Sequence, residues 1–275
     1  MNKIVVITGA TGVLCKTMAK AMAEKGYRVV IVARKKENAD AVAQEIMKFG
    51  GMAMGVEADV LDKKSLITAK KIVNETWGTC DILINGAGGN HPLGTTSKPY
   101  FNPDDLQNTQ ENFKTFFDLD PEGMQFVFNL NFTGTLLPTQ VFAQDMMGKE
   151  GCSILNISSM NAYTPLTKIP AYSGAKAAVS NFTQWLAVHF SKVGIRVNAI
   201  APGFFLTQQN KTLLTQENGE LTERGNTIIS QTPMSRFGKP EDLITTTLFL
   251  CDENSAFVTG VVIPVDGGFS AFSGV

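Results

Sequence analysis

Three residues in one stretch of the chain, Ser159, Tyr172 and Lys176, could together transfer a proton. Tyr172 and Lys176 are four residues apart, so on a helix their side chains leave the same face, and Pro170 favours a helix that begins there. We expect the ammonium of Lys176 to lower the pKa of the Tyr172 phenol from its ordinary value of about 10. The Ser159 hydroxyl could bind a carbonyl or alcohol oxygen while Tyr172 moves the proton. Hydride transfer between a nicotinamide and a carbonyl or alcohol carbon requires this arrangement. The spacing of Tyr172 and Lys176 alone also fits two solvated helix residues.

The bulk properties of the chain favour one large α/β domain. It has 275 residues, 44% hydrophobic and 18% charged, which is enough apolar material for a core covered on both faces. The formal net charge of −1 comes without a block of like charge, so we expect neither nucleic acid nor a membrane surface as a partner. We also expect no membrane span and no signal peptide, because a strand pattern begins at the N-terminus and no run of about 18 apolar residues follows. Scattered cysteines and two distant histidines favour reduced thiols in the cytoplasm and no metal site.

Short apolar segments alternate with helical patterns along most of the chain. This order is typical of βαβ units, which join parallel strands. We therefore predict one domain over residues 1–275, a doubly wound, Rossmann-type α/β fold whose seven-stranded parallel sheet has helices on both faces. The predicted strands are 3–8, 27–33, 52–57, 81–84, 152–157, 195–200 and 261–265. Two predicted helices end near residues 25 and 49, and four others span 62–77, 122–147, 171–192 and 241–251. We expect Asp62 to be the N-cap of the helix 62–77 and Pro138 to kink the helix 122–147.

The first strand leads into a glycine-bearing turn, TGATGVLC at 8–15, that opens a helix. Such a turn leaves backbone N–H groups free to bind a pyrophosphate, although it also fits an ordinary tight connection. The candidate cofactor contacts in it are Gly9, Thr11, Gly12, Val13 and Leu14.

The end of the second strand bears on the choice of cofactor. A carboxylate there would hold a ribose 2′-hydroxyl and repel a 2′-phosphate. This chain has Ala33 and Arg34 instead, which favours NADP(H) over NAD(H), with a solvated arginine as the alternative and NAD(H) still possible. Asp59 and Val60, after the third strand, could reach the adenine ring.

Two long polar segments, 90–122 and 204–236, are candidate lids over a binding site. His91 opens the first segment and is either a ligand contact or a surface residue. Asn131 lies among apolar neighbours, so its side chain must either make structural hydrogen bonds or belong to a proton relay.

The order of these pieces resembles the short-chain dehydrogenase/reductase family over essentially the whole chain. The matching pieces are Thr8-Gly9 with its turn, Asp59, Asn85-Gly86-Ala87-Gly88, Asn131, Ser159, Tyr172 with Lys176, and Pro202-Gly203 with Thr207. The sequence departs from the family at the turn, where Val13 and Cys15 stand at the places of the last two glycines. Because Cys15 is small, we expect a local shift there and retained binding.

The resemblance implies a role for each matching residue. Tyr172 would be the proton donor or acceptor, Lys176 would lower its pKa and hold the nicotinamide ribose, and Ser159 would bind the substrate oxygen. Asn131 would fix a water in the proton relay. The remaining residues that the resemblance places at the cofactor are Asn85, Ala87, Pro202, Gly203 and Thr207. The family also implies a homo-oligomer, commonly a tetramer, with the Tyr172 helix at an interface.

Four segments resemble, within that family, the bacterial D-mannonate oxidoreductase (fructuronate reductase) branch: 86–92, 129–142, 158–176 and 264–275. This resemblance implies the interconversion of D-fructuronate and D-mannonate. Both are small sugar acids, and their hydroxyls and carboxylate need polar partners. The candidate substrate contacts are Asn90, His91, Ser159, Asn161, Tyr163 and Tyr172. Two alternatives remain open: a related gluconate or polyol dehydrogenase, and a non-catalytic nucleotide-binding regulatory protein.

Overall fold

The computed structural model describes residues 3–207 and 210–274. Seven parallel strands form one sheet in the order β3-β2-β1-β4-β5-β6-β7. The strands are β1 (Ile4–Thr8), β2 (Arg28–Ala33), β3 (Met52–Glu57), β4 (Ile82–Asn85), β5 (Cys152–Ile157), β6 (Ile195–Pro202) and β7 (Val262–Val265). The predicted fold class is confirmed, and the predicted strand ends differ from these by at most two residues.

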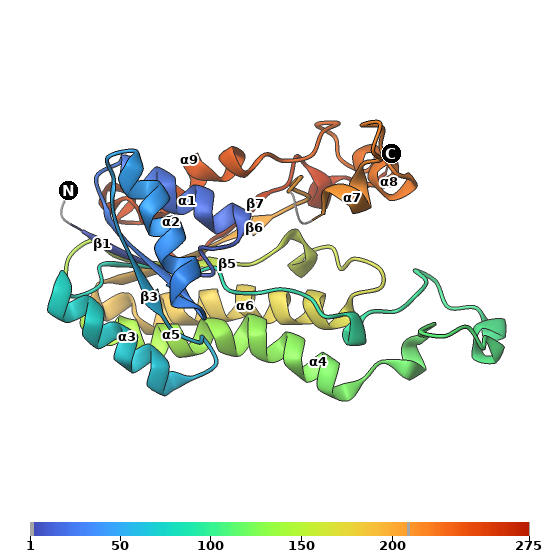
Figure 1. Ribbon diagram of the computed structural model, residues 1–275, viewed down its shortest axis with the longest axis horizontal. Helices are drawn as coiled ribbons and strands as arrows, with labels where there is room; N and C mark the ends of the chain where they lie inside the picture. Colours follow the sequence, from blue (N-terminus) through green and yellow to red (C-terminus); the bar gives the residue numbers. More distant parts are fainter. Residues whose placement is uncertain (1–2, 208–209, 275) are drawn as a thin grey trace.

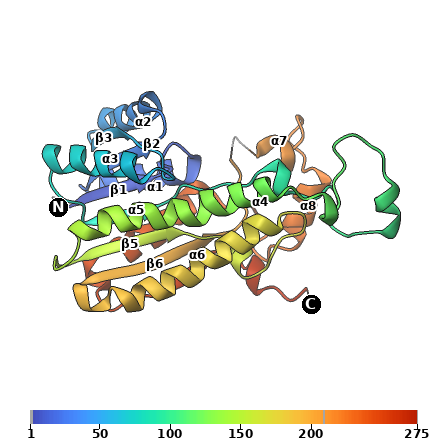
Figure 2. The same ribbon diagram turned by 90° about the horizontal axis from the view of Figure 1, so that it is seen from below.

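Helices cover both faces of the sheet (Figure 1). The helices are α1 (Val13–Glu24), α2 (Lys36–Lys48), α3 (Lys63–Thr76), α4 (Pro121–Phe128), α5 (Gly134–Phe142), α6 (Pro170–His189), α7 (Lys211–Leu214), α8 (Glu223–Ser230) and α9 (Ile244–Cys251). Helices α1, α2 and α9 lie on one face, and α3, α5 and α6 lie on the other (Figures 1 and 2). The strands therefore read as continuous apolar runs, because a parallel sheet is buried on both sides.

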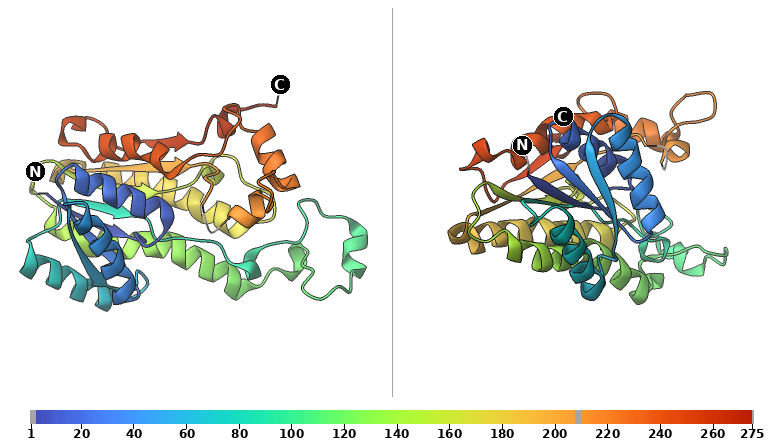
Figure 3. Two further views of the ribbon diagram at one scale, coloured as in Figure 1. Left: turned by 45° about the horizontal axis from the view of Figure 1, so that its top comes forward. Right: turned by 60° about the vertical axis from the view of Figure 1, so that its left-hand side comes forward.

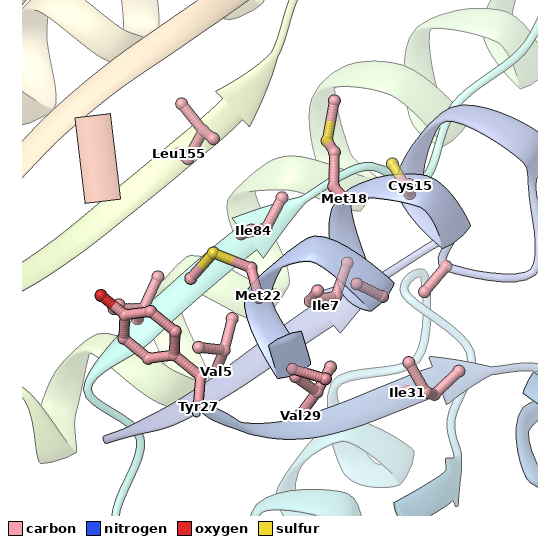
Figure 4. Close-up of a cluster of buried hydrophobic side chains, with 14 of the residues drawn as sticks. Val5, Ile7, Cys15, Met18, Met22, Tyr27, Val29, Ile31, Ile84 and Leu155 are labelled. Atoms are coloured by element: carbon pink, nitrogen blue, oxygen red, sulfur yellow. The ribbon is translucent and has the colours of Figure 1, made fainter. Parts of the chain in front are cut away.

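The core is correspondingly two apolar layers, one on each side of the sheet. Figure 4 shows part of the first layer, where Met18 and Met22 of α1 pack over Ile7 and Ile84 of the central strands. All four of these side chains are fully buried. Burial of this kind stabilises a fold by about 1.5–3 kcal/mol per large side chain.

Local signals set several helix ends. Asp62 accepts a hydrogen bond from the N–H of Lys64 at 2.9 Å and so caps α3 as predicted. The predicted helix 122–147 is instead interrupted: a π-helical segment, Asn129–Thr133, separates α4 from α5. The irregularity thus lies upstream of Pro138, which sits inside α5, and not at the proline where we predicted a kink.

Both predicted lid segments lie beyond the carboxyl edge of the sheet (Figure 3). Segment 204–236, described except for 208 and 209, carries α7 and α8. Segment 90–122 carries three short 3-10 helices, and its tip extends away from the sheet (Figure 2). The tip is closed at its base by Ser97 and Lys114, which exchange two hydrogen bonds of 2.8 Å. In this conformation the tip does not cover the strand ends, so the lid role of this segment stays a prediction.

Candidate active site

The glycine turn after β1 and the small residues after β4 meet at the carboxyl edge of the sheet. Gly9 has φ of 68°, and a Cβ on it would lie 2.6 Å from the carbonyl oxygen of Gly86. The Thr8 hydroxyl accepts hydrogen bonds from the N–H groups of Gly86 and Ala87 at 3.1 and 3.3 Å. Only glycine fits at position 9, because both the backbone conformation and the space exclude a side chain. The strand order reverses between β1 and β4, which is where ligands bind in sheets of this kind.

The first turn of α1 has the features of a pyrophosphate site. Gly12 is its N-cap, in extended conformation, and no side chain caps the helix there. The N–H of Gly12 bonds to the carbonyl of Gly9 at 3.0 Å, which closes the turn. The N–H groups that follow have no capping side chain and lie at the positive end of the helix dipole. This turn carries Gly9, Thr11, Gly12, Val13 and Leu14, and their contact with a dinucleotide phosphate stays a prediction.

Cys15 fills the space that the family's glycine leaves open. Its thiol is 4.0 Å from the carbonyl oxygen of Gly86 and is buried in the first apolar layer. A Cβ on Gly86 would lie 2.2 Å from the Cys15 sulfur. Burial raises the pKa of the Cys15 thiol to about 11, so it is a neutral spacer and not a nucleophile.

A cavity of about 610 Å³ opens at the ends of β2 and β3. It is lined by Arg34 and Lys36 on one side and by Glu57 and Asp59 on the other. Lys36 is already paired with Asp40 at 2.5 Å, and the Asp59 carboxylate accepts from the N–H of Leu61 at 2.9 Å. Its lining carries a guanidinium and two carboxylates, which could hold ribose hydroxyls or a phosphate. Val60 lies beside this cavity and is buried.

The predicted proton-transfer group is assembled from β5 and α6. Pro170 begins α6 at its first position, which places Tyr172 in the first turn and Lys176 one turn later. The Lys176 ammonium lies 5.7 Å from the centre of the Tyr172 ring and donates to the carbonyl of Ile157 at 2.7 Å. Ser159 follows β5, is buried, and has its hydroxyl beside the Tyr172 phenol. The three groups thus lie together, as predicted.

The electrostatics differ from the expectation that Lys176 lowers the pKa of Tyr172. Burial raises the pKa of the Tyr172 phenol, and the hydrogen bond with Ser159 opposes that shift. Burial also lowers the pKa of Lys176 itself to about 8, with Cys15 opposing. Desolvation decides the direction of the Tyr172 shift, and the Lys176 ammonium donates to the Ile157 carbonyl. That part of the sequence interpretation is wrong.

Asn131 lies in the π-helical segment and is fully buried. Its amide nitrogen donates to the carbonyls of Gly89 and Val127 at 2.7 and 2.8 Å, and its oxygen accepts from the N–H of Gly89 at 3.1 Å. The side chain therefore ties the loop after β4 to the helix. This is the structural alternative that the sequence left open, and a water-fixing role remains a prediction.

Among the polar residues predicted to contact the substrate, Asn90 and Tyr163 make side-chain hydrogen bonds within the protein, whereas His91 and Asn161 each keep a polar side-chain atom without a partner among the described residues. Asn90 donates to Thr95 at 3.0 Å, and the Tyr163 hydroxyl donates to the carbonyl of Val262 at 2.9 Å, so both are engaged by the protein. His91 accepts from the N–H of Leu93 through Nδ1 at 3.2 Å, which leaves Nε2 as the donor of the neutral ring. Asn161 is buried, and its side-chain oxygen has no hydrogen-bond partner in the described structure.

The residues after β6 border a second cavity, of about 400 Å³. Pro202 ends the strand, and a Cβ on Gly203 would lie 2.6 Å from the Cα of Asp266. Thr207 donates its N–H to the side chain of Asn210 at 2.8 Å.

Asn85 is buried and donates to Thr139 and Asn156, so its side chain holds β4 to its neighbours.

Three contributions were not anticipated from the sequence: the Thr8 hydroxyl, the Ile157 carbonyl and the close packing of Gly88, on which a Cβ would lie 2.6 Å from the Asn131 side-chain oxygen. Thr8 and Gly88 stood inside recognised motifs, but nothing in the local pattern gave their partners. No group of three histidine, cysteine or acidic side chains within 3–207 and 210–274 is arranged to hold a metal.

The family model for short chain dehydrogenases matches residues 3–218 of this chain. The chain belongs to the short-chain dehydrogenase/reductase family. An oxidoreductase of Haemophilus influenzae is 58% identical over 275 residues, covering 100% of this chain and 95% of that protein. Members of this family bind NAD(P), so the chain is an NAD(P)-dependent oxidoreductase. The non-catalytic alternative is thereby set aside.

Solved structures of the family resemble this one closely. A Haemophilus influenzae protein with bound NAD, provisionally assigned as a D-mannonate oxidoreductase, superimposes with a TM-score of 0.95 at 57% identity, covering 100% of this chain and 97% of that one. A gluconate 5-dehydrogenase from Burkholderia cenocepacia, in complex with NADP and tartrate, has a TM-score of 0.82 at 26% identity, covering 98% and 96%. Among the helices of the described residues, none is long and apolar enough to cross a bilayer.

Proposed function

We propose that this enzyme transfers hydride between a nicotinamide dinucleotide and a sugar-acid ketone or alcohol, with D-fructuronate and D-mannonate as the pair. The observation that carries the reaction type is the cluster of the buried Ser159 and Lys176 with the half-buried Tyr172 at the carboxyl edge of the sheet. The substrate rests on similarity to the provisionally assigned D-mannonate oxidoreductase and on the segments quoted above.

Each residue of the cluster has a separate task. The Ser159 hydroxyl holds the substrate oxygen, and its own position is held by the N–H of Asn161 at 3.3 Å. Tyr172 gives its proton to that oxygen in reduction and takes it back in oxidation. Lys176, whose ammonium lies 5.7 Å from the centre of the Tyr172 ring, would hold the nicotinamide ribose. The bound nicotinamide would supply or accept the hydride.

The direct test is dinucleotide oxidation on addition of D-fructuronate to the folded protein. We expect oxidation of NADPH or NADH that depends on D-fructuronate concentration, with D-mannonate as the product. Absence of turnover with either dinucleotide, in a preparation that binds dinucleotide, would reject the substrate assignment.

Tyr172→Phe separates proton transfer from binding. Loss of a general acid reduces turnover by about 10²–10⁴-fold. Dinucleotide affinity should change by less than about threefold, because the ring and its packing remain. Turnover retained by Tyr172→Phe would show that another group supplies the proton.

A gluconate dehydrogenase is the second candidate, favoured by the similarity to the gluconate 5-dehydrogenase. D-mannonate and D-gluconate differ only in configuration at the carbon next to the carboxylate, so the catalytic residues cannot distinguish them. A panel of the two acids decides: a kcat/KM at least about tenfold higher for D-gluconate, a difference of ~1.4 kcal/mol, would favour the alternative.

For the cofactor we propose NADP(H), on the strength of Arg34 at the cavity beside β2. A guanidinium binds phosphate oxygens with charge-assisted hydrogen bonds of about 1.5–3 kcal/mol. Arg34→Ala should therefore lower kcat/KM for NADPH by about 10–100-fold relative to NADH, while Lys48→Ala, exposed at the end of α2, should leave that ratio unchanged. An unchanged ratio in Arg34→Ala, or a wild-type preference for NADH, would make NAD(H) the cofactor.

We further propose a cytoplasmic homotetramer. The exposed apolar side chains Phe126 and Phe128 on α4 and Trp185 and Val188 on α6 support association through these helices. Sedimentation of the purified enzyme tests it, and a monomer at micromolar concentration would refute it. All four cysteines are free and buried, which agrees with a reducing compartment.

A further inference from the structure

The segment Gly86-Ala87-Gly88 lies between the two halves of the active site, and we refer to it as the spacer segment. It leaves β4 at Asn85 and runs past the glycine turn of β1 toward α6. Each of its ends is packed so closely that a single methyl group would collide with a residue of one half.

The first end contacts the nucleotide turn. A Cβ on Gly86 would lie 2.2 Å from the Cys15 sulfur and 2.8 Å from the carbonyl oxygen of Thr8. From the other side, a Cβ on Gly9 would lie 2.7 Å from the N–H nitrogen of Ala87. Cys15 therefore sets the separation between α1 and the spacer segment.

The second end contacts the proton-transfer residues. A Cβ on Gly88 would lie 2.6 Å from the side-chain oxygen of Asn131 and 3.1 Å from the Lys176 nitrogen. Asn131 also holds the next residue, Gly89, by hydrogen bonds to both its N–H and its carbonyl. Lys176 is thus confined between Gly88 and the Ile157 carbonyl.

We propose that the spacer segment is a rigid link that fixes the position of Lys176 from the width of the nucleotide turn, so that Gly86 and Gly88 are positioning residues and Cys15 sets the length of the link. Interiors transmit displacement in this way because they are close-packed and have little room to relax. Positioning of Lys176 serves the family's hydride transfer to any ketone. It rests on the proposed function only in that D-fructuronate is taken as the ketone.

The decisive substitution is at the end that does not touch Lys176. In Gly86→Ala, the added methyl pushes on Cys15 and displaces the segment. We expect dinucleotide affinity to fall by at least about tenfold. We also expect the pH above which dinucleotide affinity declines, which reports the Lys176 ammonium, to move by at least about half a unit. Cys15→Ala removes the sulfur that the methyl meets, so the double variant should recover both properties at least in part. Cys15→Ala alone should move both properties less than Gly86→Ala does, because it opens space without pushing on the segment.

Gly88→Ala tests the other end. Its methyl meets Lys176 and Asn131 directly, so the pH dependence should move as well, but Cys15→Ala should not restore it. Gly94→Ala is the matched control, because its added methyl would make only an ordinary contact of 3.6 Å with Ala171. It should bind dinucleotide like the unmodified protein.

The measurement is the dissociation constant of NADPH and of NADH, by fluorescence, between about pH 6 and pH 10. It needs no sugar acid, so absence of D-fructuronate turnover would reject the proposed substrate and leave this test intact. A Gly86→Ala variant that binds more weakly but keeps an unchanged pH dependence would overturn the link. Should Gly86→Ala not fold, Cys15→Gly removes the spacing from the opposite side, and an unchanged pH dependence there would overturn the proposal equally.

Discussion

Lys176 is an ammonium in an apolar place. It is 4% exposed and has the Ile157 carbonyl as its hydrogen-bond partner. Burial lowers its pKa from 10.5 to about 8, so at neutral pH the protein holds a charge that would be better solvated in the unfolded chain. Below pH 8 the lysine is charged in the folded and the unfolded chain, so the full desolvation cost lowers the free energy of unfolding. The cost fades as the pH rises toward the ordinary value of 10.5 and is absent above it.

Lys176→Met should therefore stabilise the protein while it abolishes turnover. The pKa difference between 10.5 and about 8 corresponds to roughly 3 kcal/mol, from which loss of the hydrogen bond to Ile157 subtracts about 1 kcal/mol. We expect a higher midpoint of denaturant unfolding at pH 7 and little difference near pH 10.5. Equal stabilisation at both pH values would mean that packing, and not desolvation of the charge, is responsible.

The π-helical segment between α4 and α5 positions Asn131. Replacing this residue by leucine removes hydrogen bonds to Gly89 and Val127 and leaves Gly89 groups without their partner. We expect Asn131→Leu to lower the free energy of unfolding by about 1–3 kcal/mol. Asn129→Ala, in the same segment, loses one exposed contact with Gln125 and should cost less than about 0.5 kcal/mol. Equal losses of unfolding free energy in the two variants, measured by urea unfolding, would contradict the role of Asn131 in holding the loop after β4 to the helix.

At the scale of elements, much could be predicted from the sequence because the signals are local. Hydrophobic runs and glycine turns gave all seven strands, and Asp62 and Pro170 gave the beginnings of α3 and α6. The π-helical segment could not be predicted, because it depends on where Asn131 meets Gly89, which is 42 residues away. For the same reason the sequence placed Lys176 opposite the phenol, while the fold gives it the carbonyl of Ile157.

The tip of segment 90–122 stands apart from the rest of the molecule (Figure 2). Its side chains Tyr100, Phe116 and Phe117 are 80%, 66% and 68% exposed, although an ion pair of Lys98 with Asp105 orders it internally. The sequence indicated a long polar loop but not its direction, since direction depends on the contacts at its base.

Replacing residues 98–113 by Asn-Gly, between the paired Ser97 and Lys114, should leave the fold intact. We expect the thermal midpoint to change by less than about 4 °C, because the hydrogen bonds of the excised residues stay within the loop. Retention of dinucleotide binding in the shortened protein checks that the crevice is unaffected. Loss of folding would mean that the tip is packed against the domain.

The hydrogen bond from Tyr163 to the Val262 carbonyl connects the loop that begins at Ser159 to β7. That strand is the last in the sheet and pairs only with β6, and its side chains are only partly covered. Strands at a margin are the first to fray when a protein is warmed. Inactivation by gentle heating is therefore expected to begin at the border of the sheet and to reach Ser159 while the centre is still folded.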